Sequence, residues 1–389
     1  MKEFAHTTDH DSADRKPAAA SLWEVAGVFV KLGCIGFGGP AVHIAMMEEE
    51  VVRKRKWISP EHFLDLVGAT NLIPGPNSTE MTMHCGHERA GWKGLVVAGM
   101  CFIIPAVIIT GALAWAYQRY GSLPEVQPFI YGIKPAIIAV VVALMISLGW
   151  KAFKNKTLSF IGAIALVLTL TGVSEIAVLF GAGLAGVLIY FLTMRSSDLN
   201  IFSPLMLLGL SLEKLQVSHW KLFWIFLKIG SILYGSGYVL FAFLDAELVA
   251  KGLLSKQELI DAIAVGQFTP GPVFSAATFI GWQLGGINGA IAATAGIFLP
   301  SFLFVAFLNP LIPYLRRSKI MSAFLDTVNV AAVAIILAVA IEMGRETFED
   351  WRTIVIAIAG FAVTFYFKKL NSAFVVVGGA VLGYILWLI

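Results

Sequence analysis

The residues best suited to chemistry surround two Pro-Gly-Pro motifs, and each motif interrupts an otherwise apolar run. The first lies in Asn71-Leu-Ile-Pro-Gly-Pro-Asn-Ser-Thr-Glu80 and the second in Gln267-Phe-Thr-Pro-Gly-Pro-Val-Phe-Ser275. Two prolines around a glycine break a helix, and proline suits the first turn of the next one. A helix that begins inside a membrane offers free N–H groups and the positive end of its dipole to an anion. The motifs therefore predict an anion site at each break.

Both breaks should line an interior site, because irregular backbone at membrane depth is tolerated only where protein or a water-filled cavity satisfies its polar groups. The residues predicted to bind substrate there are Pro74, Gly75, Pro76, Asn77, Ser78, Thr79, Pro270, Gly271, Pro272 and Ser275. Glu80, which closes the first motif, is the candidate for proton coupling. The alternative is that each motif is only a kink, or a loop outside the membrane.

Two lysines, Lys31 and Lys228, form the second predicted part of the substrate site, because each lies well inside an apolar run. An unpaired cation in that position costs from about 2.5 kcal/mol upward. An anionic substrate would balance both charges. The alternatives are that each lysine reaches a headgroup layer, or pairs with an acid such as Glu80, Asp245 or Glu247.

A glycine-rich segment follows each lysine, Gly36-Phe-Gly-Gly-Pro40 in one case and Gly235-Ser-Gly-Tyr238 in the other. Glycine permits broken helix geometry and close backbone approach, so we add Gly38 and Gly39 to the predicted site. Close helix packing explains the same glycines equally well.

The composition places these motifs in a membrane protein. Of the 389 residues, 58% are hydrophobic and only 14% are charged, with a mean hydropathy of +0.81, whereas soluble domains carry about 25% charged residues. One helical crossing needs about 20 apolar residues. The apolar runs predict an all-α polytopic protein with about ten full crossings plus two broken or re-entrant segments. We expect it in the cell membrane, as a multi-pass protein; if the source is a Gram-negative bacterium, this is the inner membrane.

The chain repeats itself at offsets of 195 to 197 residues. Lys31 recurs as Lys228, the first Pro-Gly-Pro as the second, and Pro105 as Pro300. We predict a polar tail at 1–21, transmembrane repeats at 22–194 and 219–389, and a connector at 195–218. If the two broken segments dip in and return, each half has an odd number of crossings, and the halves are inverted repeats.

Other classes of protein find little support. The net charge of +3 comes from basic residues in short loops, which predicts no nucleic-acid surface. Gly181-Ala-Gly-Leu-Ala-Gly186 fits a dinucleotide pattern, but it lies inside an apolar run, so helix packing is favoured. His84, Cys85 and His87 lack further ligands for a metal site. The chain has no Walker A sequence. We therefore predict no cofactor, no metal and no enzyme.

Several stretches together resemble the chromate ion transporter family in its long, two-domain form. They are Phe29-Val-Lys-Leu-Gly33, Phe37-Gly-Gly-Pro40 with His43, Glu50-Val-Val-Arg-Lys-Arg-Lys-Trp57, and both Pro-Gly-Pro motifs. The resemblance covers nearly the whole chain from about residue 22. It implies a secondary transporter that exports chromate, or a related oxyanion such as sulfate, and protects the cell. Glu80 departs from the family pattern, which often has an amide there, and this leaves the identity of the substrate open.

Two other functions stay open at this stage. An anion channel would need a continuous open path, whereas matched broken helices in inverted halves favour a carrier. A membrane-embedded enzyme would need a nucleophile, metal or cofactor pattern that the sequence does not offer. We expect the protein to be surrounded by membrane lipid. The sequence leaves the oligomeric state open, a homo-oligomer included.

Overall fold

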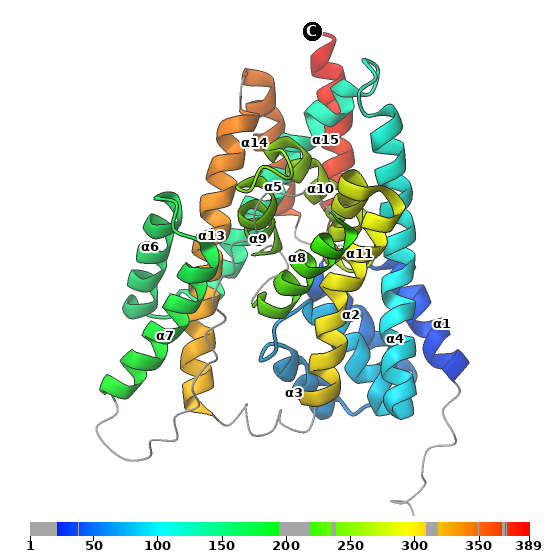
Figure 1. Cartoon of the computed structure of the whole chain (residues 1–389), viewed down its shortest axis with the longest axis vertical. Coiled ribbons are helices and arrows are strands. Elements are labelled where there is room, and N and C mark those ends of the chain that lie inside the picture. Colours follow the sequence, from blue (N-terminus) through cyan, green and yellow to red (C-terminus); the bar gives the residue numbers. More distant parts are fainter. Residues whose placement is uncertain are drawn as a thin grey trace, which may run out of the picture.

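The computed structural model describes residues 22–37, 39–193, 218–234, 239–308, 318–348, 350–367, 370 and 372–389, and every regular element in these ranges is a helix (Figure 1). The expectation of an all-α protein is confirmed for this part of the chain. Outside it lie the predicted tail 1–21, nearly all of the predicted connector, the predicted site residue Gly38, and the segment 235–238.

The first half opens with a hairpin of short helices, α1 (Leu22–Ile35), then α2 (Pro40–Met47) and the π-helix η1 (Glu48–Lys54). Gly39, with a φ of 86°, and Pro40 at the first turn of α2 produce the break between them. The Lys31 Nζ to Glu50 Oε1 distance is 2.9 Å, and His43 Nε2 lies 2.8 Å from the Gly36 carbonyl oxygen. These contacts make the hairpin antiparallel, so the apolar run that begins at residue 22 is not one continuous helix.

A second hairpin follows, formed by α3 (Pro60–Thr70) and the first limb of α4 (Asn77–Tyr120). His62 Nε2 lies 3.2 Å from Glu88 Oε2 at one end, and Asn77 Nδ2 donates to Asn71 Oδ1 at 2.7 Å at the other. The two helices are therefore antiparallel, and the Pro-Gly-Pro break lies at the tip between them.

The long helix α4 is divided by a sharp turn at Gly91, whose φ is 59°. A Cβ added to Gly86 would overlap the carbonyl oxygen of Gly94, although eight residues of a straight helix would separate the two by about 12 Å. The chain therefore reverses at Gly91, and the first limb, up to residue 89, packs closely on the start of the second limb.

The second half reproduces this plan. Its elements are α8 (His219–Ile232), α9 (Val239–Leu244), η2 (Asp245–Val249), α10 (Lys256–Phe268), η3 (Val273–Ser275) and α11 (Ala276–Leu308). Gly286 turns α11 with a φ of 58°, and a Cβ on Gly281 would overlap the carbonyl oxygen of Gly289. The duplication read from the sequence thus extends to the backbone geometry of both kinks.

The remaining helices form the rest of the bundle. In the first half they are α5 (Gln127–Ala152), α6 (Lys156–Leu170) and α7 (Glu175–Thr193), and in the second α13 (Lys319–Thr347), α14 (Trp351–Tyr366) and α15 (Ser372–Trp387). The two sets interlock, since α5 packs on α14 and α15 while α13 packs on α6 and α7. Gly183 and Gly186 contact Phe324 and Thr327 of α13. The glycine-rich segment 181–186 is therefore used for helix packing.

Five helices in the described residues are long and apolar enough to cross a membrane: Asn77–Tyr120, Gln127–Trp150, Glu175–Leu192, Val273–Phe307 and Lys319–Thr347. Three shorter apolar helices, α6, α14 and α15, accompany them. This supports a multi-pass membrane protein. The five are fewer than the ten predicted crossings because each half begins with hairpins of short helices. The number of crossings stays a prediction.

Candidate functional site

The two Pro-Gly-Pro breaks are each hydrogen-bonded to the opposite half of the chain. The Gly75 N–H donates to the Leu233 carbonyl oxygen at 2.8 Å, and the Gly271 N–H donates to the Gly36 carbonyl oxygen at 2.7 Å. Leu233 and Gly36 each follow the first helix of their half, α8 and α1. The φ angles of Gly75 (135°) and Gly271 (90°) suit glycine alone. All six residues of the two motifs are buried.

The first break gathers buried polar atoms that make no well-formed hydrogen bond within the described residues, although the Ser301 hydroxyl lies within reach of the Glu80 carboxylate. They are both carboxylate oxygens of Glu80, the Thr79 hydroxyl and the Ser301 hydroxyl. Glu80, Thr79 and Ser301 are each 0% exposed. A Cβ on Gly75 would meet the Glu80 carboxylate and would lie 2.6 Å from Ser301 Oγ. Since buried polar groups are nearly always paired, this cluster is equipped to bind a polar ligand.

The second break differs from the first in chemistry. Ser275 Oγ accepts a hydrogen bond from Thr110 Oγ1 at 3.1 Å, and Thr269 Oγ1 lies 3.4 Å from the same Thr110 oxygen. These three hydroxyls are buried and satisfy one another. The second break therefore carries no charged group, and its three hydroxyls bond to one another, although the buried amide nitrogen of Gln267 has no hydrogen-bond partner in the described residues. The first break differs in holding an acid and open hydroxyls.

The predicted donors at the start of α4 are divided between surface and interior. Asn77 is half-buried and its amide is bonded to Asn71 at 2.7 Å, whereas Ser78 and Thr79 are buried. The N–H groups of Thr79 and Glu80 already bond to the Pro76 carbonyl oxygen. The free backbone donors at this helix start are thus those of Asn77 and Ser78.

Lys31 and Lys228 are both paired with acids in symmetric positions. Lys31 bonds to Glu50 at 2.9 Å, and Lys228 bonds to Glu247 at 2.6 Å. Both lysines are therefore paired with acids, which was the alternative to substrate binding. The partner of Lys31 is Glu50 and not Glu80. With the lysine charges balanced, neither lysine needs a substrate anion to compensate it.

Glu50 is the centre of a larger charge cluster, since Lys54 at 3.3 Å and Arg55 also bond to it. It lies outside the candidate spans. The hydrogen bond from Lys31 lowers the pKa of the Glu50 carboxyl to about 2, despite the opposing effect of burial. The cluster is therefore fully ionised at neutral pH and holds the first hairpin closed.

Two residues of this region were not among the predicted site residues. Ser301 lies next to Pro300 in α11 and reaches the first break from the other half of the chain, so no local pattern could reveal it. His84 is 1% exposed, and both of its ring nitrogens lack hydrogen-bond partners in the described ranges. The sequence feature that could have pointed to His84 is its spacing from Glu80, one helical turn along the same helix. No group of three or more metal-ligating side chains occurs in the described residues.

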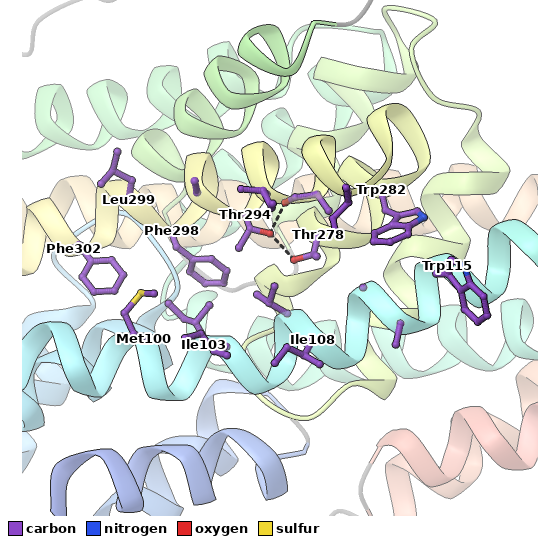
Figure 2. A pocket seen from close by; sticks show the side chains of 18 of the residues that line it. Met100, Ile103, Ile108, Trp115, Thr278, Trp282, Thr294, Phe298, Leu299 and Phe302 are labelled. Carbon is purple, nitrogen blue, oxygen red and sulfur yellow. Dashed lines mark hydrogen bonds between the residues drawn. The ribbon is translucent and has the colours of Figure 1, made fainter. Parts of the chain in front are cut away.

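A separate apolar cavity of about 950 Å³ lies between the second limb of α4 and α11 (Figure 2). Along the second limb of α4 the lining residues run from Met100 to Ile108. Along the second limb of α11 Phe302 lies beside Met100 and Thr294 lies nearer to Ile108, so these two limbs run antiparallel. The cavity lining has no charged side chain. Its two threonine hydroxyls, of Thr278 and Thr294, bond to each other, so the helix breaks are the better candidate site for an oxyanion.

Comparison with known proteins agrees with the duplicated architecture. The sequence model of the family described as "Chromate transporter" matches residues 23–187 and again residues 220–384. The "Chromate transport protein" of Cupriavidus metallidurans is 30% identical over 93% of this chain and 92% of its own length. The "Probable chromate transport protein" of Synechococcus elongatus is 29% identical over 97% and 99%. The "Chromate transport protein" of Pseudomonas aeruginosa is 27% identical over 95% and 94%. No solved structure matches this chain.

Proposed function

This chain belongs to the chromate transporter family, and we propose that it carries chromate across the cell membrane as a secondary transporter, with the substrate bound at the paired helix breaks. The observation that carries this proposal is the buried cluster at Gly75, where Glu80, Thr79 and Ser301 bring polar atoms together without well-formed hydrogen bonds. Free N–H groups at the start of α4 add donors for an oxyanion.

The two halves are proposed to be inserted in opposite orientations. The antiparallel course of the second limbs of α4 and α11, with Met100 beside Phe302 and Ile108 nearer to Thr294, supports this arrangement. Inverted halves that meet at a central site suit a carrier that alternates its access.

The orientation can be tested with single cysteines placed just after each kink, Lys93→Cys and Asn288→Cys, in a chain without native cysteines. Both positions are exposed. A membrane-impermeant thiol reagent should label them from opposite sides of the membrane. Labelling from the same side contradicts inverted halves.

Export is the proposed direction. Moving a dianion out of an interior-negative cell is favoured by roughly 4.6 kcal/mol per 100 mV, twice the value of about 2.3 kcal/mol for one charge. Sulfate has the same charge and tetrahedral shape and is the proposed competitor. The family relationship and the buried site support chromate, and the energetics support its outward movement.

Glu80 is the proposed coupling group. An ionised carboxylate at the break would repel a dianion, whereas the protonated acid can donate a hydrogen bond to it. Proton binding and anion binding are therefore linked at this position.

The transport mode is tested with purified protein in proteoliposomes, in which the membrane potential and the pH gradient are imposed separately. The proposal expects saturable chromate flux with counterflow, accelerated by an interior-negative potential in the outward direction and inhibited by sulfate. Flux without saturation or counterflow would indicate a channel.

A further inference from the structure

We propose that His84 passes protons between the membrane surface and Glu80, along one face of the first limb of α4. This inference rests on the proposed function, because it supplies the route that proton coupling at Glu80 requires. The route begins at the pair formed by His62 and Glu88, continues to His84, and ends at Glu80.

The three residues of α4 follow one another at intervals of four, as Glu80, His84 and Glu88. Side chains four residues apart on a helix lie on the same face, with Cβ atoms about 5–6 Å apart. That separation lets neighbouring groups meet directly or through one water. The line thus runs two turns along the helix, from the Pro-Gly-Pro break to the turn at Gly91.

The exposed fraction of the side chains increases from Glu80 through His84 to Glu88. Glu80 is 0% exposed and His84 is 1% exposed. The side chain of Glu88 is 33% exposed, and it lies 3.2 Å from His62, which is 46% exposed. The outer pair is therefore in contact with solvent, while the inner two groups are enclosed.

The inner groups are free to exchange protons. Neither ring nitrogen of His84 has a hydrogen-bond partner in the part of the chain that is described, and the Glu80 carboxylate, which the Ser301 hydroxyl approaches, makes no well-formed hydrogen bond there. A neutral imidazole has one donor and one acceptor nitrogen, so it can take a proton on one side and release one on the other. A buried histidine kept only for packing would ordinarily satisfy at least one of these nitrogens.

The second half of the chain shows that the fold does not need titratable groups in this line. The pairs Gly86 with Gly281 and Gly91 with Gly286 align the two half-helices with an offset of 195 residues. The counterparts of Glu80, His84 and Glu88 are then Ser275, Phe279 and Gln283. Phe279 is fully buried, as His84 nearly is. An apolar ring fills the equivalent place, so packing alone does not explain His84.

Other titratable and charged groups surround the first limb of α4 and its neighbours. They are Glu24 and Lys31 of α1, His43 of α2, Glu50 of η1, His62 and Asp65 of α3, His87, Glu88 and Arg89 of α4, and Tyr234 after α8. Glu24 bonds to Arg89 at 3.1 Å, Glu50 bonds to Lys31, and His43 bonds to the Gly36 carbonyl oxygen. Glu24, Glu50 and His43 are therefore engaged with partners other than His84.

The proton transfer balances without a further reactant. A proton from water reaches one ring nitrogen of His84 by way of the His62–Glu88 pair, which gives an imidazolium. The other ring nitrogen then releases its proton to the Glu80 carboxylate, and the ring is neutral again. The net change is one proton moved from solution to Glu80.

The test uses the full chain in proteoliposomes, with labelled chromate to measure anion flux and a trapped pH dye to measure proton flux. The variants are His84→Phe, which installs the residue of the second half, and His84→Gln, which stays polar but does not titrate. Thr82→Val is the matched control, because Thr82 is buried on the same limb and its hydroxyl bonds only to Met47 and to the Ser78 carbonyl oxygen.

We expect the ratio of proton flux to chromate flux to fall about 100-fold in both His84 variants, the lower end of what a positioned acid-base group contributes, and to be unchanged in Thr82→Val. An unchanged ratio in His84→Phe overturns the proposal. A wild-type ratio in His84→Gln also overturns it, because polarity without titration would then suffice. Chromate flux without proton flux in the wild type refutes the relay but leaves chromate transport standing.

A second measurement separates failure of the relay from failure of the proposed function. Infrared spectroscopy identifies the Glu80 carboxyl as the band that disappears in Glu80→Gln, and deuterium exchange of that band needs no chromate. Exchange should slow about 100-fold in His84→Phe. If the wild type carries no chromate, the proposed transport function is refuted. The proton relay is still tested by this exchange rate, because the exchange needs no chromate.

Discussion

The backbone N–H of Gly75 donates to the carbonyl oxygen of Leu233 at 2.8 Å, which ties the helix break of the first half to the first helix of the second half. Gly271 makes the corresponding bond to Gly36 at 2.7 Å. Each break thus depends on the other half for a backbone partner. A movement of one half against the other must strain or break these two bonds, which makes the breaks a natural place to couple binding with movement.

Replacing Gly75 by alanine should destabilise the protein and abolish chromate transport. At a φ of 135° a residue with a Cβ is strained by about 1–3 kcal/mol. The added Cβ would also collide with Glu80 and Ser301, adding to that cost. The melting temperature of the purified protein, measured by intrinsic fluorescence, checks the first effect. Gly27→Ala is the matched control, since a Cβ there has nothing within 4 Å. Equal melting temperatures for the two variants would show that the break tolerates a side chain.

Thr79→Val should weaken chromate binding without loss of expression. The Thr79 hydroxyl is buried and has no hydrogen-bond partner among the described residues, so its removal leaves no group unpaired inside the protein. Loss of one hydrogen bond to a charged ligand corresponds to about 1.5–3 kcal/mol, or a rise of roughly 10- to 150-fold in the dissociation constant. Equilibrium binding of labelled chromate measures the change. Thr82→Val serves as the control, and equal affinities in the two variants would remove Thr79 from the site.

Lys31→Met should have a small effect. Glu50 keeps Lys54 and Arg55 when Lys31 is lost, and the Lys31 side chain is 54% exposed. Exposed ion pairs contribute about 1 kcal/mol or less, so chromate flux should stay within about fivefold of the wild type. Glu50→Gln should be more harmful, because it leaves three cations without their shared acid.

The double variant Lys31→Met with Glu50→Gln should recover part of the lost stability, since it removes one of those three cations. Flux and melting temperature are measured in both single variants and in the double. A fall of about 100-fold in Lys31→Met with an unchanged melting temperature would mean that Lys31 binds the substrate directly.

The features that were predictable from the sequence are those set by local chemistry. Proline and glycine fix where a helix must stop, so both Pro-Gly-Pro breaks were identified from residue types alone. The repeat was visible because matched residues recur at nearly constant offsets. The helical class followed from a composition too poor in charge for a water-facing surface.

The features that were not predictable depend on contacts between distant residues. Ser301 approaches Gly75 from the other half of the chain, and Glu50 reaches Lys31 only because the chain reverses at Gly39 and Pro40. Hydropathy alone does not show that reversal, since the residues on both sides of it are apolar. Burial of Glu80 and His84 without well-formed hydrogen bonds is likewise a property of the packed structure.

Chromate counterflow with the purified protein shows whether this chain carries chromate through a site at the first helix break. Proteoliposomes loaded with unlabelled chromate are diluted into a trace of labelled chromate, with no imposed potential or pH gradient. We expect transient accumulation of label by the wild type, and loss of that accumulation in Gly75→Ala but not in Gly27→Ala. Absence of counterflow in folded wild-type protein, or undiminished counterflow in Gly75→Ala, would contradict chromate transport through this site.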